Sequence, residues 1–295
     1  MSAQGVAVIT GATGVIGSTI ARRLLAHDMK VVAVARHAKG AQIERLFGEG
    51  ATANVVLCDA DVSDAEQVRE LMAYTAGAFG RLDVLLNAAG TYGAIGSVLE
   101  VAPGTWKAAF DTNLMGCYSC CHFALPYMVA AKRGRIINVA GGGSTGPLDH
   151  FSCYAASKAA LARFTDTLAS EVKEMGIVAN AILPGSVDSG MQDQLLAAGA
   201  RAGAWYPKMK RMRETGEGFA AASLTADLVE FLLFGAGRVL SGKLLSARYD
   251  GFASWQAAEI EAIAATELFA LRRMDLVTLK PIVSLEPGIG RFEKK

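Results

Sequence analysis

Short runs of mostly apolar residues alternate with helical segments along most of this chain. The runs lie at 6–9, 31–34, 55–57, 84–86, 135–139 and 178–182, and a weaker candidate lies at 243–246. Uninterrupted apolar strands are typical of parallel sheets that are covered on both faces. Alternation at this spacing is typical of right-handed strand–helix–strand crossovers. The sequence therefore predicts an α/β fold: a doubly wound parallel sheet of about seven strands with helices on both faces.

The same rhythm covers residues 1–251 without a Pro-, Gly- or Ser-rich linker, which predicts a single domain. Residues 191–223 carry no strand pattern, and we expect them to form a mobile lid of helices over the strand ends. Residues 252–295 follow the last expected strand as a C-terminal extension, which we expect to be helical over 257–273 and irregular from 280. We expect the extension to pack on the domain or on a neighbouring subunit.

Composition narrows the class of partner. Hydrophobic residues make up 52% of the 295 residues and charged residues 19%, so the chain can bury a large core. The formal net charge is +1, which gives no electrostatic reason to expect nucleic acid or an anionic membrane. Residues 1–5 show no signal-peptide pattern, and no uncharged apolar run approaches membrane-spanning length. We therefore expect a cytoplasmic protein whose partner is a small molecule.

The cysteines give no sign of a disulfide framework or a metal centre. There are five of them, and an odd number without a signal peptide argues against structural disulfides. Zinc-binding residue types do cluster in the segment Cys117, Cys120, Cys121 and His122, but no second cluster completes four ligands at zinc-like spacing. We expect small buried residues on a packed helix there, and no metal site.

The turn between the first strand and the first helix is rich in glycine. Glycines at such a turn permit a tight bend and let the backbone approach a pyrophosphate closely. The start of the following helix offers free N–H groups and a positive dipole to the anion. The turn therefore predicts a dinucleotide site of the Rossmann type that includes Gly11, Thr13, Gly14, Ile16 and Gly17.

The end of the second strand indicates which dinucleotide binds. An NAD enzyme usually places Asp or Glu there to accept hydrogen bonds from the ribose hydroxyls. This chain has Ala35 at that place, followed by Arg36 and His37. A guanidinium group pairs well with phosphate oxygens, although a solvated surface arginine is the alternative interpretation. We therefore expect NADP(H) in preference to NAD(H).

Tyr154 and Lys158 are four residues apart at the start of a predicted helix, so their side chains share one face. A nearby ammonium group favours the phenolate, and we expect it to lower the pKa of the tyrosine. Such a tyrosine acts as a general acid or base nearer neutral pH. The pair follows a strand and a glycine loop, which favours a catalytic role over an ordinary helix surface.

The chain resembles the short-chain dehydrogenase/reductase family in an ordered set of motifs: the glycine turn, Asn87-Ala88-Ala89-Gly90, Tyr154-Ala155-Ala156-Ser157-Lys158 and Pro184-Gly185-Ser186-Val187-Asp188-Ser189. The resemblance covers roughly residues 5 to 250 and points to the short single-domain branch. It implies an NAD(P)-dependent oxidoreductase that transfers a hydride between nicotinamide and a secondary alcohol or ketone, with Tyr154 as proton donor or acceptor. It also implies a homodimer or homotetramer formed through the two long helices.

The resemblance implies further roles for individual residues. Asn113 matches an asparagine that helps to carry a proton relay through water to Lys158, although an asparagine satisfied locally in its helix is the alternative. The lysine also holds the nicotinamide ribose in the family. Beyond the glycine turn, the implied cofactor contacts are Arg36, His37, Asp61, Val62, Asn87, Ala88, Gly90, Tyr154, Lys158, Pro184, Gly185, Val187 and Ser189.

The catalytic serine of the family is missing. Gly141 stands where the family places a serine that hydrogen-bonds the substrate oxygen. Losing a donor to a developing oxyanion typically costs about 2–4 kcal/mol, so we expect another group to replace it. Ser144 is the candidate, because three preceding glycines let its loop fold inward. Thr145, Ser152 and a bound water are the alternatives.

Two other classes of function stay open. The glycine spacing, with Val15 where the short branch usually has glycine, looks like that of the longer, sugar-nucleotide-modifying branch of epimerases and dehydratases. The glycine at position 141 fits a catalytically weakened cofactor-binding or regulatory protein. The segment 87–90 and the absence of a separate substrate domain argue against the first class. Intact Tyr154, Lys158 and Asn113 argue against the second.

Overall fold

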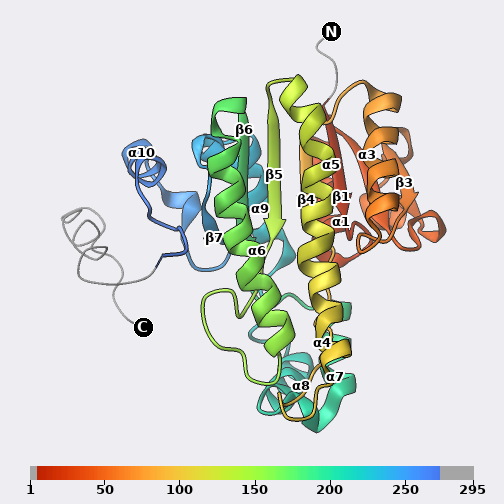
Figure 1. The fold of residues 1–295 in the computed structure, drawn as a ribbon, viewed down its shortest axis with the longest axis vertical. Helices are drawn as coiled ribbons and strands as arrows, with labels where there is room; N and C mark the ends of the chain where they lie inside the picture. Colours follow the sequence, from red (N-terminus) through yellow and green to blue (C-terminus); the bar gives the residue numbers. More distant parts are fainter. Residues whose placement is uncertain (1–4, 273–295) are drawn as a thin grey trace.

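Residues 5–272 are described by the computed structural model, and they form one sheet with helices on both faces (Figure 1). The strand order is β3-β2-β1-β4-β5-β6-β7, and every neighbouring pair is parallel. The predicted fold class is confirmed. The strands are β1 (Val6–Thr10), β2 (Lys30–Ala35), β3 (Val55–Asp59), β4 (Val84–Asn87), β5 (Gly134–Val139), β6 (Ile177–Leu183) and β7 (Leu244–Ser246).

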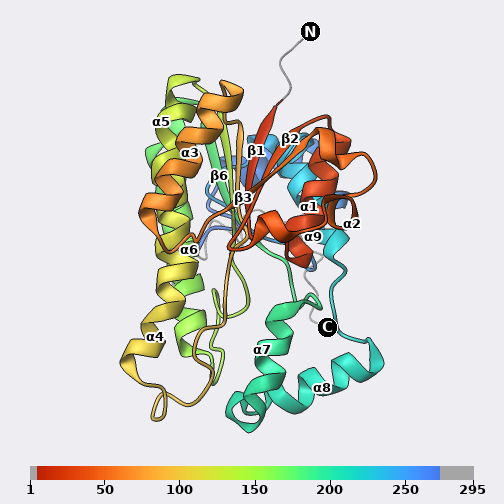
Figure 2. The ribbon, with the colours of Figure 1, turned by 90° about the vertical axis from the view of Figure 1, so that its right-hand side faces the viewer.

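Helices cover the sheet from both sides, so the central strands are buried on both faces (Figure 2). Successive residues of β1 show the division, because Val8 packs in one hydrophobic core and Ile9 in the other. This double burial explains the continuous apolar runs in the sequence. On one face lie α1 (Val15–Ala26), α2 (Ile43–Phe47) and α9 (Ala222–Leu233), and on the other lie α3 (Ala65–Phe79), α5 (Gly116–Ala130) and α6 (Ser152–Glu171).

The carboxyl ends of the parallel strands meet at one edge of the sheet, and the strand order reverses there between β1 and β4. In open α/β sheets, ligands bind in the crevice beyond this point. Three helices lie beyond the same edge in Figure 2: α4 (Pro103–Phe110), α7 (Gly190–Ala198) and α8 (Trp205–Thr215). The region expected to form a lid, 191–223, is thus helical at this edge, as its sequence suggested.

A π-helical turn over Asp111–Met115 joins α4 to α5. Such turns are rare in proteins as a whole. Those that do occur often lie at functional sites, because the wider coil redirects side chains. This turn carries Asn113, which is buried. The fold therefore brings the glycine turn, the segment after β4, the π-helical turn and the start of α6 around one crevice.

The part of the C-terminal extension that the structure describes, 252–272, packs on its own chain. Its helix α10 (Ala257–Ala265) buries Ile260 and Ile263 in the core that contains α9. The ring of Trp255 lies against Phe231 and Phe269, with centroids 6.0 and 5.2 Å away. These contacts bury apolar surface within one subunit.

The helix predicted over 257–273 is too long, because α10 ends at Ala265. The chain then returns to the edge of the sheet, where the Leu244 N–H of β7 donates to the Phe269 carbonyl at 2.6 Å. The Lys243 ammonium donates to the Thr266 carbonyl at 2.5 Å. Pairing with a distant strand edge therefore decides the end of this helix. Residues 273–295, including the segment expected to be irregular from 280, lie outside the described residues.

Candidate active site

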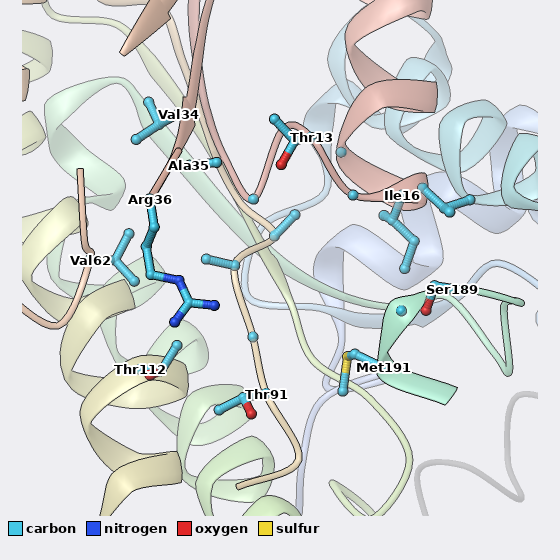
Figure 3. Close-up of a pocket in the computed structure, with 18 of the residues that line it drawn as sticks. Thr13, Ile16, Val34, Ala35, Arg36, Val62, Thr91, Thr112, Ser189 and Met191 are labelled. Atoms are coloured by element: carbon cyan, nitrogen blue, oxygen red, sulfur yellow. The ribbon is translucent and has the colours of Figure 1, made fainter. Parts of the chain in front are cut away.

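A cavity of about 480 Å³ lies at the crevice beyond β1 and β4 (Figure 3). Its wall is formed by the glycine turn, the end of β2, the segments after β3 and β4, the π-helical turn and the start of α7. The predicted cofactor residues in this wall are Gly11, Thr13, Gly14, Ile16, Gly17, Arg36, His37, Asp61, Val62, Ala88, Gly90 and Ser189.

The glycine turn is built for a close approach. Gly11 has a φ of +65°, and a Cβ there would lie 2.8 Å from the Ala89 amide nitrogen. A Cβ at Gly17 would overlap the Gly11 carbonyl oxygen, so α1 reaches the turn only because residue 17 has no side chain. Gly14 precedes α1, and within residues 5–272 no side chain caps that helix, which leaves its first N–H groups for an anion. The Val15 side chain is 39% exposed and leaves the turn open.

Arg36 extends its side chain into the cavity, as Figure 3 shows. Asp61 lies in the same wall and accepts hydrogen bonds from the Ser63 hydroxyl and N–H at 2.6 and 2.9 Å. These bonds, and to a smaller extent the charge of Arg36, hold the pKa of Asp61 below its usual value. The cavity thus combines a free helix start with an arginine, a combination that fits the pyrophosphate and a further phosphate of a dinucleotide.

Six predicted cofactor residues lie outside the cavity wall: Asn87, Tyr154, Lys158, Pro184, Gly185 and Val187. The Asn87 amide donates to the Asn138 side-chain oxygen at 2.9 Å, which ties the end of β4 to the end of β5. The Val187 carbonyl accepts from the Gln192 amide of α7 at 2.8 Å. In this structure Asn87 and Val187 hold neighbouring segments together.

The cavity also contains residues that the sequence motifs do not include. Thr91 directly follows Gly90, so a motif longer by one residue would have found it. Thr112 comes from the π-helical turn, and Met191 and Gln194 come from α7. No local pattern marks these three, because only the tertiary structure brings their helices to the crevice.

Tyr154 and Lys158 lie one turn apart on α6, and both side chains are buried. The Lys158 ammonium donates to the Val139 carbonyl at the end of β5 at 2.7 Å and lies 6.0 Å from the centre of the Tyr154 ring. Burial lowers the pKa of Lys158 to about 8 and raises the pKa of Tyr154 above its usual value. The expectation of a lowered tyrosine pKa is therefore wrong for this structure, because desolvation of the phenol outweighs an ammonium at this distance.

Asn113 lies beside the same pair. Its amide nitrogen donates to the Thr91 carbonyl and to the Ser157 hydroxyl, both at 2.9 Å, and its oxygen accepts from the Thr91 N–H at 2.9 Å. A Cβ at Gly90 would lie 3.3 Å from the Asn113 oxygen and 3.5 Å from the Lys158 nitrogen. Both polar side chains therefore reach the space directly behind Gly90, at the cavity wall.

Ser144, the candidate to replace the family serine, has a hydroxyl that is already engaged. It is 4% exposed and donates its proton to the Gly141 carbonyl at 2.7 Å. Of the alternatives, Thr145 is exposed, and the Ser152 hydroxyl accepts from the Trp106 indole at 3.0 Å. A Cβ at Gly141 would overlap the hydroxyl oxygen of Tyr154, so the phenol lies directly against the glycine backbone.

The lid covers the tyrosine. Tyr154 is 7% exposed, and its ring packs in an apolar cluster to which α7 and α8 contribute. The Tyr92 ring contacts it edge-on, with centroids 4.9 Å apart. Other buried members of this lid cluster are Ile95, Phe151, Leu195, Ala198, Ala202, Met209 and Met212.

Hydrogen bonds and ion pairs hold the lid in this position. The Tyr92 hydroxyl donates to the Gln192 side-chain oxygen at 3.0 Å, and the Thr91 hydroxyl to the Gln194 side-chain oxygen at 3.2 Å. Arg213 of α8 pairs with two acidic side chains near the start of α7, Asp188 at 2.6 Å and Asp193 at 3.0 Å. These contacts connect α7 to the segment after β4, and they connect α8 to α7 and to the residue Asp188 before it.

The described residues offer no group of three or more His, Cys, Asp or Glu side chains that could hold a metal ion. All five cysteines are free thiols, and Cys117, Cys120 and Cys121 are buried on α5. Across the same residues, every helix is too short or too polar to cross a membrane.

The fold and the cavity thus define a dinucleotide-binding α/β protein with a buried Tyr–Lys pair, and comparisons with known proteins agree. A family model described as short chain dehydrogenase matches residues 5–199. The chain is 34% identical over 196 residues to a 3-oxoacyl-[acyl-carrier-protein] reductase of Synechocystis sp., covering 65% of this chain and 78% of the relative. It is 33% identical over 195 residues to a 2-dehydro-3-deoxy-L-rhamnonate dehydrogenase (NAD(+)) of Sphingomonas sp., covering 64% and 74%.

A solved structure agrees with these sequence matches. A variant of the actinorhodin polyketide ketoreductase with NADPH superposes with a TM-score of 0.75 at 27% identity, covering 85% of this chain and 98% of that one. The chain belongs to the short chain dehydrogenase family, and it is an oxidoreductase of that family. None of these three proteins is named as a regulatory protein or a sugar-nucleotide epimerase.

Proposed function

We propose that the protein is an NADP(H)-dependent dehydrogenase/reductase that interconverts a secondary alcohol and a ketone, with Tyr154 as the proton donor or acceptor. The observation that carries this proposal is that Lys158 and Asn113 both lie directly behind Gly90, at the wall of a dinucleotide-sized cavity. A helix surface or a decayed site has no reason to retain this arrangement.

The chain's own residues divide the work of holding the cofactor. The glycine turn and the start of α1 would hold the pyrophosphate, Asp61 and Val62 the adenine, and Lys158 the nicotinamide ribose. We assign the segment with Pro184, Gly185, Val187 and Ser189 to the nicotinamide. When bound, the nicotinamide supplies or accepts the hydride.

The proton moves through the protein. Burial keeps the Tyr154 phenol protonated, which is the form that donates a proton to a carbonyl oxygen. Lys158 and Asn113 would resupply that proton, because both lie within reach of the cavity wall at Gly90. We assign Ser144 to the positioning of the loop at Gly141, whose carbonyl it binds.

Arg36 supports the choice of NADP(H). It stands in the cavity wall directly after Ala35, which occupies the place where an NAD enzyme usually has Asp or Glu. The related ketoreductase structure contains NADPH, whereas the Sphingomonas relative is named for NAD(+), so the family itself allows either cofactor. The preference therefore depends on Arg36 and His37 of this chain.

A second cavity, of about 660 Å³, offers a place for the substrate, and its wall combines small apolar side chains with the charged side chains of Glu100 and Arg201. It lies between the segment after β4, α4 and the end of α7, and it shares Gln194 with the first cavity. Ile95 and Ala198 line it and also pack in the lid cluster with Tyr154. Small side chains such as Ala94, Ala102 and Ala197 leave room for the unreactive part of a substrate.

We also propose that the chain forms a homodimer or homotetramer through α5 and α6. Exposed apolar side chains support this assembly: Met115, Tyr118, Tyr127 and Val129 are each at least 36% exposed on or next to α5. Light scattering of the purified chain tests the assembly, and a monomer at micromolar concentration would refute it. The cytoplasmic location expected from the sequence stays a prediction that cell fractionation tests.

The first test is turnover. Oxidation of NADPH and NADH is measured with a panel of ketones, and reduction of NADP⁺ with the matching alcohols, for the wild type and Tyr154→Phe. We expect turnover with NADPH, and a loss of at least ~10³-fold in Tyr154→Phe with unchanged NADPH affinity, because the phenol proton is gone while the cavity is intact. Retained turnover in Tyr154→Phe would refute the assigned role.

A further inference from the structure

The absence of a serine at position 141 leaves the substrate oxygen with one known donor, Tyr154. A second donor must lie close to the Tyr154 ring, border the cofactor cavity and have a proton that a ligand can reach. The Ser144 hydroxyl is engaged with the Gly141 carbonyl. The Ser157 hydroxyl donates to the Tyr154 backbone carbonyl at 2.8 Å. Both protons are held by main-chain carbonyls, which cannot rotate away from the hydroxyls as a side chain can.

Tyr92 lies close to the Tyr154 ring, and it adjoins the cofactor cavity through its neighbours in the chain and not through its own side chain. Its hydroxyl proton is held by a side chain of α7 and not by a main-chain carbonyl. Tyr92 follows Gly90 and Thr91, which line the cofactor cavity, and it precedes Gly93, which lines the second cavity. Its ring packs edge-on against Tyr154 at 4.9 Å and against Phe151 at 5.0 Å. Tyr92 therefore packs against Tyr154 from the segment whose neighbouring residues line the two cavities.

The Tyr92 hydroxyl is held in place by the lid. It donates to the Gln192 side-chain oxygen at 3.0 Å, while the Gln192 nitrogen donates to the Val187 carbonyl at 2.8 Å. Because Val187 fixes the nitrogen end of the amide, the oxygen end faces Tyr92. Burial raises the pKa of Tyr92 to about 12, so its proton is present at neutral pH.

We propose that the Tyr92 hydroxyl replaces the family serine as the second hydrogen-bond donor to the substrate oxygen. Rotation of the hydroxyl about its C–O bond turns its proton from Gln192 to that oxygen, without movement of the ring. Gly141 makes room for the other tyrosine, because the Tyr154 hydroxyl lies where a side chain on residue 141 would be. The site is thus built from two tyrosines. This inference rests on the proposed function and names a further catalytic residue for it.

The test compares Tyr92→Phe with Ser144→Ala and with Tyr206→Phe, which removes a hydroxyl from a tyrosine of α8 packed on the same cluster. Three quantities are measured on the full chain: kcat/KM for ketone reduction, the affinity for NADPH, and the affinity for the ketone in the complex with NADP⁺. The last is a binding measurement that needs no turnover.

We expect Tyr92→Phe to lower kcat/KM by about 10²-fold, as the loss of an oxyanion donor does, and to weaken ketone binding about three- to tenfold. Its NADPH affinity should stay within about twofold, because the cofactor cavity does not include the Tyr92 side chain. The loss should be smaller on an electron-poor ketone, whose oxyanion needs less stabilisation; a change in packing alone would affect both ketones equally. Tyr206→Phe should match the wild type.

Three results would overturn the assignment. If Tyr92→Phe stays within twofold of the wild type in both kcat/KM and ketone affinity, the Tyr92 hydroxyl does not bind the substrate oxygen. A loss confined to Ser144→Ala returns the role to that serine. A wild-type chain that binds NADPH but neither reduces nor binds any ketone refutes the proposed function and this assignment together, which separates that failure from the first two.

Discussion

Two parts of the crevice differ in the groups that form them: the cofactor end, which is the cavity at the glycine turn, and the part around Tyr154. The wall of the cofactor cavity consists largely of glycine backbone, a helix start and strand ends, and it is open in the structure. Tyr154, the proposed proton donor or acceptor, is by contrast 7% exposed beneath apolar side chains of α7 and α8. The short segment that contains Gly90, Thr91 and Tyr92 belongs to both parts, and so does α7, whose Met191 lines the cavity and packs on the cluster around Tyr154.

This difference has a physical reason. A pyrophosphate is bound by backbone N–H groups whose positions the strand and helix fix, so the site is ready before the ligand arrives. Proton transfer needs a site without bulk water, where each polar contact is stronger, and side chains must close such a site. We therefore expect the cofactor end to bind its ligand without rearrangement, and we expect substrate entry to break the contacts of α7 at Gln192 and Gln194.

The largest effect is expected on NADPH affinity, from a change in the glycine turn at the cofactor end. In Gly17→Ala, the new Cβ would overlap the Gly11 carbonyl, so α1 must move away from the turn. We expect the NADPH affinity, measured by fluorescence titration, to fall at least ~10²-fold, with a lower melting temperature, because the backbone N–H groups no longer face the pyrophosphate. The matched control is Gly77→Ala in α3, where a Cβ meets nothing within 4 Å. Unchanged NADPH affinity in Gly17→Ala would show that the turn is softer than its geometry indicates.

The next largest effect is expected on the free energy of unfolding, from the buried Lys158 beside Tyr154. Burial lowers the folded-state pKa of Lys158 to about 8, below its unfolded value near 10.5, so the unfolded chain binds more protons between these pH values. The free energy of unfolding of the wild type should therefore rise with pH across this window. Lys158→Met should be more stable than the wild type by about 1–3 kcal/mol at pH 7, with turnover lost, and the gain should vanish toward pH 10.5.

Denaturant unfolding at several pH values measures this difference. Lys210→Met is the control, because that lysine is exposed on α8 and should show no comparable pH-dependent gain. A Lys158→Met variant that is less stable at pH 7 would mean that the bond from Lys158 to the Val139 carbonyl outweighs the desolvation of the ammonium.

The smallest effect is expected on the ratio of NADPH to NADH affinity, from a change of Arg36 at the cofactor end. Arg36→Met should weaken NADPH binding by about tenfold, because an exposed arginine gives a modest charge-assisted contact to a phosphate. NADH binding should change less than twofold. Isothermal titration with both cofactors measures the ratio. Equal weakening of both would place Arg36 against the adenine instead of the 2′-phosphate.

The fold was predictable to a large extent because parallel strands buried on both faces leave continuous apolar runs, and these runs match β1 to β6 closely. The cavity wall was predictable where a motif is local: the glycine turn and the segment Ala88–Gly90 lie within single connections. Residues such as Thr112 and Gln194 were not, because they reach the cavity from helices whose approach depends on packing. The end of α10 was missed for the same reason.

The sequence by itself determined the α/β architecture, the family and the presence of Tyr154, Lys158 and Asn113 on their elements, since each follows from spacing along one strand or helix. The tertiary structure alone decided that Tyr154 is buried, that its pKa is raised, that its hydroxyl occupies the space beside Gly141, and that Tyr92 stands next to it. These properties depend on which distant segments exclude water from a side chain. No spacing within one element encodes that exclusion.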